Sequence, residues 1–321
     1  MTAPLLDVRG LRVAFPMGGG WGEAVRGVDF AVAPGEAVGL VGESGSGKSL
    51  SALAIMRLIA APGRIAGGII RFDGQDLLAL PESGMRRLRG RHIGMVFQDP
   101  STSLNPAFSV GQQLVDTIRA HRPELGRKAL RDRAAEVLSL VGITEPQRRL
   151  TAYPHQFSGG MRQRVLIAMA IACEPRLLIA DEPTTALDVT VQARVVELLN
   201  RLRQQLGLTV LFISHNLDLV AELCDRVVVM YAGQVVEEAA TVDLFTHPRH
   251  PYTRLLQRCI PRLGLAGHRL PAIEGAPPPA GRVPPGCAFA ERCPDAVQRC
   301  ALAPPARRAL DGHDVACWEA A

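Results

Sequence analysis

Short apolar runs alternate with amphipathic segments over the first three quarters of the chain. Four β-rich runs predict buried strands at residues 37–41 (AVGLV), 177–180 (LLIA), 209–214 (TVLFIS) and 226–231 (RVVVMY). Between the second and the third run, residues 189–207 repeat apolar side chains at helical spacing, which predicts an amphipathic helix. Because strands alternate with helices, the pattern predicts an α/β fold with a mostly parallel sheet wrapped in helices.

Two regions depart from this alternation. Strand signals vanish between residues 99 and 156, where RKALRDRAAEVLSLVG is typical of a helix, so we expect a helical insertion there. The composition then shifts near the C-terminus, because residues 261–321 hold 10 of the 24 prolines. We therefore predict a main domain over residues 1–245 with a helical subdomain at about 99–160, and a separate C-terminal module over residues 246–321.

Composition narrows the class of protein only a little. The 321 residues are 47% hydrophobic and 21% charged, which is ordinary for a globular protein, and no uninterrupted apolar run is long enough to span a bilayer. The first residues, MTAPLLDVRGLRVAF, lack a basic segment followed by an apolar core, so we expect a cytoplasmic protein. A net charge of +5 over this length is weak support for nucleic-acid or membrane binding.

The most specific signal is the loop GESGSGKS, which lies between the first predicted strand and the helical segment LSALAIMRLI. It fits G-x-x-x-x-G-K-[ST] with the required flanks, and these flanks argue against a chance glycine-rich turn. Glycines let backbone N–H groups wrap phosphates, Lys48 would reach the β and γ phosphates, and the Ser49 hydroxyl would ligate Mg²⁺. The predicted nucleotide-binding residues of this loop are Gly42, Ser44, Gly45, Ser46, Gly47, Lys48 and Ser49.

Two carboxylates follow the second predicted strand, in LLIADEP. The strand brings Asp181 to the C-terminal edge of the sheet, where open α/β sheets bind ligands, so Asp181 is the predicted Mg²⁺ carboxylate. Glu182 stands beside it and would orient or deprotonate the water that attacks the γ phosphate. An acidic pair that only complements a helix dipole is the plain alternative, and the phosphate loop argues against it.

A second anion cradle is predicted at FSGGMRQRV, residues 157–165. Ser158, Gly159 and Gly160 precede a helical segment, so bare backbone N–H groups would face an anion. For Ser158 alone, a helix cap remains the alternative.

These motifs together resemble the ABC-type ATPases, because FSGGMRQRV is similar to their signature motif and stands about twenty residues before the Asp181 strand. The resemblance implies a P-loop NTPase ABC ATPase fold and two ATPase domains paired head to tail, each signature motif closing over ATP held by the partner's phosphate loop. It also implies roles for Gln98 as the Q-loop residue that meets Mg²⁺, Asp188 in the D-loop, His215 as the switch histidine, and Phe15 as the ring that stacks on adenine, with Trp21 as a competitor.

Further segments resemble one branch of that family. FQDPSTSLNP, HPRHPYTRLL and the cysteine-bearing tail are similar to the ATPases of oligopeptide, dipeptide and nickel importers, and Met161 resembles the dipeptide-type D subunit. The resemblance implies ATP-driven peptide import, with a nickel or other small solute, or a mainly nucleotide-sensing role, as alternatives. It implies as partners a homologous ATPase, two transmembrane permease subunits and an extracellular or periplasmic binding protein, with no nucleic acid, at the cytoplasmic face of the membrane. Residues 99–114 would meet a membrane subunit, or form a solvated loop.

The tail carries its own candidate site. Cys287, Cys293, Cys300 and Cys317 are separated by 5, 6 and 16 residues in a proline-rich segment that has few large apolar side chains to hold it together. Disulfides are disfavoured in a reducing cytoplasm, and zinc sites usually show a closer C-x₂₋₄-C pair. Four thiolates from an irregular loop fit an iron-sulfur cluster, and the resemblance implies a [4Fe-4S] cluster in this region. Four reduced, unliganded cysteines are the alternative.

Overall fold

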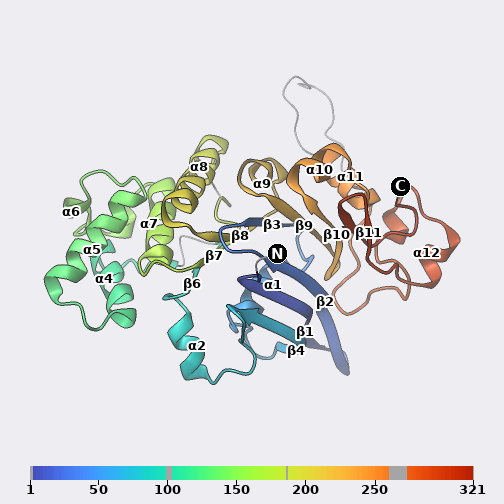
Figure 1. The fold of residues 1–321 in the computed structure, drawn as a ribbon, viewed down its shortest axis with the longest axis horizontal. Coiled ribbons are helices and arrows are strands. Elements are labelled where there is room, and N and C mark those ends of the chain that lie inside the picture. Colours follow the sequence, from blue (N-terminus) through green and yellow to red (C-terminus); the bar gives the residue numbers. More distant parts are fainter. Residues whose placement is uncertain (1–2, 99–102, 186, 260–272, 321) are drawn as a thin grey trace. The chain divides into compact units, whose positions relative to one another are not determined.

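The computed structural model describes residues 3–98, 103–185, 187–259 and 273–320, and its contacts divide the chain into two compact units (Figure 1). Unit 1 comprises Met1–Val32, Ala37–Leu78 and Ser214–Ala321, and unit 2 comprises Ala33–Glu36 and Ala79–Ile213. The predicted C-terminal module therefore lies in unit 1, together with the phosphate loop. Residues 99–102, which open the segment predicted to meet a membrane subunit, lie outside the described residues.

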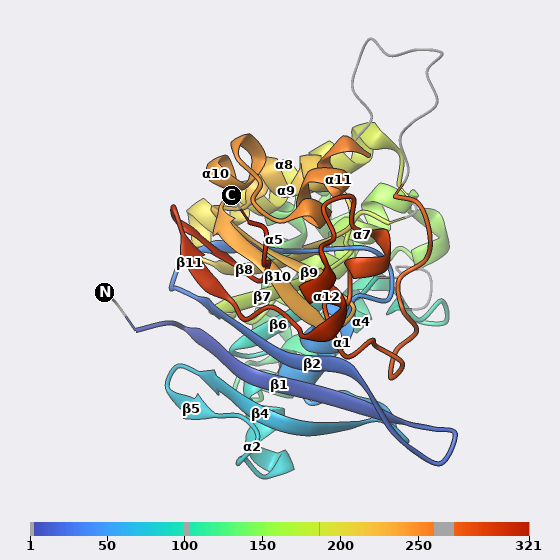
Figure 2. The same cartoon turned by 90° about the vertical axis from the view of Figure 1, so that its right-hand side faces the viewer.

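An antiparallel sheet near the N-terminus forms one layer of unit 1 (Figure 2). Along its central strand, Leu6 and Val8 are buried whereas Arg9 and Arg12 are exposed, which is the alternation of a strand with one face on a core. Gly10 has positive φ, and the pairing of this strand with its neighbour shifts register; both features interrupt the alternation. The strand order is β2-β1-β4-β5, with bounds β1 Leu6–Met17, β2 Gly20–Val32, β4 Arg64–Phe72 and β5 Gln75–Asp76.

The remaining strands of unit 1 carry the phosphate loop on one side and the tail on the other. β3 (Ala37–Val41) pairs in parallel with β9 (Arg226–Tyr231), and β9 pairs antiparallel with β10 (Gln234–Ala240). The tail then adds β12 (His313–Val315) to β10 and β11 (Arg308–Leu310) to β12. The helical elements are α1 Lys48–Ile55, α9 Leu217–Leu223, α10 Thr241–Thr246, α11 Pro251–Arg258, η2 Ala290–Arg292 and α12 Gln298–Leu302.

Unit 2 is built on three parallel strands that are almost entirely buried. β7 (Leu177–Asp181) lies between β6 (Ile93–Val96) and β8 (Thr209–Ser214), and buried strands of this kind read as continuous apolar runs. The helical elements are α2 Glu82–Leu88, α4 Val110–His121, α5 Arg127–Leu140, α6 Pro146–Arg149, η1 Pro154–Gln156, α7 Gly159–Ile171 and α8 Val189–Leu206. Among the described residues, no helix combines the length and the apolar character that a membrane crossing needs.

The structure confirms the predicted strands and extends the picture. The strands at residues 37–41, 209–214 and 226–231 have the predicted bounds, and the one at 177 runs one residue further, to Asp181. The four-stranded antiparallel sheet and the short strand β6 were not predicted. The other sheet is mixed rather than mostly parallel, because β10, β11 and β12 pair antiparallel. The half-exposed, bulged strands β1 and β2 lack the uninterrupted apolar runs by which the buried strands were recognised.

Candidate functional site

The predicted phosphate loop of unit 1 connects β3 to α1 and holds Lys48 almost completely buried, with 4% of its surface exposed. The Lys48 ammonium donates to the carbonyl oxygens of Gly42 at 2.8 Å and Glu43 at 3.0 Å. Gly47 caps α1 with φ 100°, a conformation that glycine adopts without strain. The backbone at the start of the loop therefore binds the lysine at its end, directly before the N-terminus of α1.

The loop also needs glycine for space. A Cβ at Gly42 would lie 2.2 Å from the carbonyl oxygen of Met230, so no larger residue fits there. Ser44 and Gly45 are exposed at the tip. The Ser46 hydroxyl is buried and has no hydrogen-bond partner among the described residues. Ser49 is half-buried in the first turn of α1, and the backbone amides at the start of a helix are a common binding site for anions.

The predicted catalytic carboxylate lies in a tight turn of unit 2. Asp181 ends β7 and is 5% exposed, and Glu182 follows with φ 46°, a strained value for a residue with a side chain. The Glu182 carboxylate accepts from the Gln98 amide and from the Thr185 hydroxyl, both at 2.9 Å on Oε2. The structure thus brings Gln98 and Glu182 together and adds Thr185, which sequence reasoning missed because no motif distinguishes it.

The signature motif and the D-loop are neighbouring helix starts in unit 2. Ser158 caps α7 and accepts from the backbone N–H of Met161 at 3.3 Å, and both Ser158 and Gly159 are exposed. Asp188 caps α8 and accepts from the backbone N–H of Val191 at 2.9 Å. A Cβ at Gly160 would lie 2.8 Å from the Val191 side chain, which ties the two helix starts together. Ser158 is therefore a helix cap, and Gly159 beside it is exposed at the surface of the subunit.

The other predicted nucleotide residues lie in unit 1. His215 is exposed and follows the end of β8 directly. Phe15 is half-buried with its ring against Gly63, where a Cβ would lie 2.4 Å from the ring. Trp21 is 49% exposed, and the guanidinium of Arg64 stands 3.8 Å from its ring centroid. The choice of Phe15 over Trp21 as the adenine-stacking ring stays a prediction.

The four tail cysteines line a single small cavity of unit 1, whose lining residues also include His250 and Asp295. Burial raises the pKa of the Cys287 and Cys317 thiols and raises that of Cys293 to about 11. None of the four forms a disulfide. Among the described residues, no group of three or more His, Cys, Asp or Glu side chains is arranged to hold a metal ion, so the predicted cluster site stays a prediction.

A buried carboxylate fastens the tail strands. Glu237 on β10 is fully buried and accepts from the backbone N–H groups of Arg249 and His250 and from Nδ1 of His313 on β12. His250, 1% exposed, accepts from the N–H of Tyr252 through Nδ1, and burial lowers its pKa to about 3. These bonds satisfy the buried carboxylate of Glu237.

A strand–glycine loop–helix element and a carboxylate at the end of a buried parallel strand define the P-loop NTPase class. The chain belongs to the ABC transporter family, whose pattern it matches over residues 25–185. Residues 236–300 match a second family, the oligopeptide/dipeptide transporter C-terminal region.

Relatives and solved structures agree with this assignment. A Brucella melitensis protein named as a peptide import ATP-binding protein is 50% identical, over 97% of this chain and 95% of its own. The oligopeptide transport ATP-binding protein OppD of Mycobacterium bovis is 51% identical over 94% of this chain and 50% of its own. The ATP-binding cassette MJ0796, dimeric in a post-hydrolysis state with ADP and Pi, matches with a TM-score of 0.66 and 28% identity over 74% of this chain and 98% of that one. Clostridium perfringens cbiO1, part of the transporter complex cbiONQ, also gives 0.66 at 28% identity, over 77% and 92%.

Proposed function

We propose that this chain is the ATP-hydrolysing subunit of an ABC importer that takes up peptides. One observation carries the proposal: a chain with a phosphate loop, and with the predicted catalytic glutamate in a formed turn, also matches the oligopeptide/dipeptide transporter C-terminal region. Relatives that are about half identical along nearly the whole chain are named for peptide import and for oligopeptide transport.

In the proposed reaction each side chain has a distinct task. The phosphate loop and Lys48 bind the β and γ phosphates, while Glu182, held by Gln98 and Thr185, accepts a proton from the attacking water. The hydroxyl of Ser49, the carboxylate of Asp181 and the amide of Gln98 are the oxygen ligands that Mg²⁺ prefers, and the bound ion would neutralise phosphate charge. His215 would contact the γ phosphate.

The proposed partners follow from the exposed signature motif. Ser158, Gly159 and Gly160 would close over ATP on a homologous ATPase subunit, because amides at a helix start face outward there. Two permease subunits and a substrate-binding protein would complete the importer, with this chain at the cytoplasmic face of the membrane and residues 99–114 toward a permease. ATP binding would join the two ATPases and hydrolysis would separate them, which moves the permeases between their access states.

Transport by the assembled importer tests the proposal. The complex, reconstituted in vesicles with its binding protein, should accumulate a labelled di- or oligopeptide only with ATP, and Lys48→Ala in this chain should abolish uptake because it removes the phosphate contact. Arg258→Ala, at the end of α11, is a surface control for a lost cation. ATP-dependent uptake of nickel but of no peptide would replace the proposed substrate, and hydrolysis-independent uptake would contradict the function.

For the tail we propose a [4Fe-4S] cluster on Cys287, Cys293, Cys300 and Cys317. The four cysteines line one cavity, and four cysteine thiolates are the usual ligands of such a cluster. Protein purified without oxygen should contain about four irons per chain. Cys300→Ser should lose most of that iron, whereas Cys259→Ser, outside the cavity, should keep it. Zinc without iron, or no metal at all, would contradict the cluster.

A further inference from the structure

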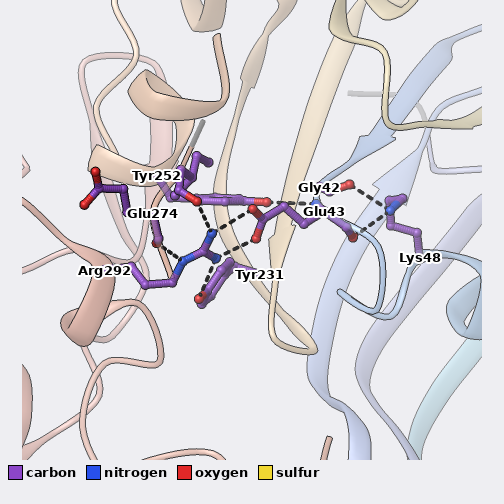
Figure 3. A network of polar contacts seen from close by, with 8 residues as sticks. Gly42, Glu43, Lys48, Tyr231, Tyr252, Glu274 and Arg292 are labelled. Carbon is purple, nitrogen blue, oxygen red and sulfur yellow. Dashed lines mark hydrogen bonds and ion pairs between the residues drawn. The ribbon is translucent and has the colours of Figure 1, made fainter. Parts of the chain in front are cut away.

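The C-terminal region contacts the phosphate loop at Glu43 (Figure 3). Glu43 is the second residue of GESGSGKS. Its carboxylate accepts hydrogen bonds from both terminal nitrogens of Arg292, at 2.6 and 2.9 Å. Its backbone N–H donates to the Tyr252 hydroxyl at 2.8 Å. Side chain and backbone of one loop residue are thus held by two different elements, η2 and α11.

The guanidinium of Arg292 is itself fully engaged. Its side chain is 5% exposed, and it donates to the Tyr231 hydroxyl at 3.1 Å and to the carbonyl oxygens of Ile273 and Glu274 at 3.2 and 2.9 Å, in addition to Glu43. A bidentate arginine–carboxylate pair of this kind fixes orientation as well as distance. The pKa of Arg292 is raised above its usual value, chiefly by the hydrogen bonds to Glu43.

Three aromatic rings hold the two residues that bind Glu43, Arg292 and Tyr252, in place; these two are the clamp residues. The ring centroids of Tyr231, Tyr252 and Phe289 lie 4.7 to 5.3 Å apart, in the tilted or edge-on arrangements that aromatic pairs prefer. Tyr231 ends β9, Tyr252 belongs to α11 and Phe289 directly precedes η2, so the cluster joins the sheet to the tail. The Tyr252 hydroxyl is therefore aimed at the loop by a packed ring, not by a mobile side chain.

The clamped residue bears directly on the phosphate-binding lysine. The carbonyl oxygen of Glu43 accepts from Lys48 at 3.0 Å and from the backbone N–H of Ser46 at 3.2 Å. Glycines at positions 42, 45 and 47 give the loop backbone freedom that ATP binding must remove. Holding Glu43 from outside removes part of that freedom beforehand, and preorganisation of this kind raises affinity.

We propose that Arg292 and Tyr252 are positioning residues that preorganise the phosphate loop through Glu43, so that the C-terminal region sets the affinity for ATP. The inference rests on the proposed function, because it concerns the same nucleotide site. It assigns to this region a role at the phosphate loop in addition to any cluster that it holds. Both clamp residues lie within residues 236–300, the part that matches the oligopeptide/dipeptide transporter region.

Equilibrium titration of the full-length chain with a fluorescent ATP analogue and Mg²⁺ tests the clamp. We expect binding to weaken by roughly ten-fold in each of Arg292→Gln, Glu43→Ala and Tyr252→Phe. This is the effect on affinity when ATP binding must itself fix the backbone of one loop residue. Arg292→Gln combined with Glu43→Ala should bind no more weakly than either single variant, because both remove the same pair. Tyr252→Phe should add its own loss to that double variant, because it acts on the backbone of Glu43.

The matched control is Arg254→Gln. Arg254 forms an ion pair with Asp295 at 2.8 Å in the same C-terminal region, and among the described residues no hydrogen bond or ion pair joins it to the phosphate loop, so this variant should bind the analogue within about two-fold of wild type. A role of Arg292 that is only structural predicts that Arg292→Gln weakens binding while Glu43→Ala binds the analogue like wild type.

The outcomes separate the two proposals. If wild type itself does not bind the analogue, the proposed function fails. If wild type binds, and folded Arg292→Gln binds equally well, the clamp is wrong. Should Arg292→Gln not fold, Glu43→Ala and Tyr252→Phe decide alone, because Glu43 is partly exposed and phenylalanine keeps the packed ring of Tyr252. Wild-type affinity in both of these would overturn the clamp.

Discussion

Each unit holds one glutamate beside the predicted ATP chemistry, and the two are held in different ways. Glu43 in unit 1 meets a buried guanidinium that donates to both of its oxygens from 249 residues away in sequence. The carboxylate of Glu182 in unit 2 accepts from the Gln98 amide and from the Thr185 hydroxyl. The Arg292 guanidinium fixes both oxygens of Glu43 and so makes that carboxylate a structural anchor, whereas the Gln98 and Thr185 donors both meet a single oxygen of Glu182, Oε2.

The backbone at the two glutamates differs in the same sense. Glu182 has positive φ, a strained conformation that is typical of residues with a functional constraint. Glu43 instead has its N–H bonded to the Tyr252 hydroxyl and its carbonyl oxygen bonded to Lys48. We infer that the contacts of Glu43 in unit 1 order the phosphate loop, whereas the contacts of Glu182 in unit 2 orient a reactive carboxylate. The following variants test this division.

Glu182→Gln should have the largest effect. The amide keeps the size of the side chain but cannot accept a proton, so steady-state ATPase activity of the assembled transporter should fall by about a thousand-fold while ATP binding is retained. Glu136→Gln, on an exposed helix position of unit 2, is the control and should hydrolyse ATP at the wild-type rate. Near wild-type turnover by Glu182→Gln would remove Glu182 from the chemistry and with it the contrast between the two glutamates.

Gly159→Asp should come next, with turnover of the assembled transporter reduced by roughly a hundred-fold. The new carboxylate would repel the γ phosphate held by the partner, while this chain's own phosphate loop should bind ATP unchanged, because the motif is proposed to act on the partner's nucleotide. Gly126→Asp places the same residue at the exposed start of α5, where no atom lies within 4 Å, and should be silent. A large loss of ATP affinity in the isolated Gly159→Asp chain would show that the motif acts within its own subunit.

Thr185→Val should reduce turnover by roughly ten-fold, the value of one neutral hydrogen bond to the Glu182 carboxylate. Valine keeps the shape of threonine, so packing is preserved. Thr185→Ser restores the hydroxyl and should recover most of the lost rate, which a packing defect would not allow. Equal rates for valine and wild type would mean that Gln98 alone orients Glu182.

Sequence patterns revealed what is contiguous in the chain and missed what is not. The strand before GESGSGKS, the strand that ends at Asp181 and the helix start at Ser158 are each encoded in fewer than about a dozen neighbouring residues, as local periodicity and capping require. The pairing of Glu43 with Arg292 joins residues at opposite ends of the sequence, and an arginine beside a cysteine has no pattern that names its partner. The same holds for the strands that the tail adds to β10, since three-residue strands carry too few side chains to show alternation.

The smallest effect concerns the stability of the tail that anchors Glu43. His250 is 1% exposed, its Nδ1 accepts from the N–H of Tyr252, and burial, with a smaller contribution from Arg254, lowers its pKa to about 3. The unfolded chain therefore binds the proton first, so the stabilisation is fully present above about pH 6.5 and is lost as the pH falls toward 3.

Between pH 7 and pH 5.5 this linkage should cost about 1 kcal/mol of unfolding free energy. Denaturant unfolding of wild type and His250→Asn at both pH values measures it, because asparagine can still accept the N–H of Tyr252 as a helix cap but has no titratable ring. The other titrating groups contribute equally to both proteins and cancel in the difference. The variant should lose less stability than wild type over this interval, and identical pH dependence in the two would show that His250 already binds its proton in the folded tail.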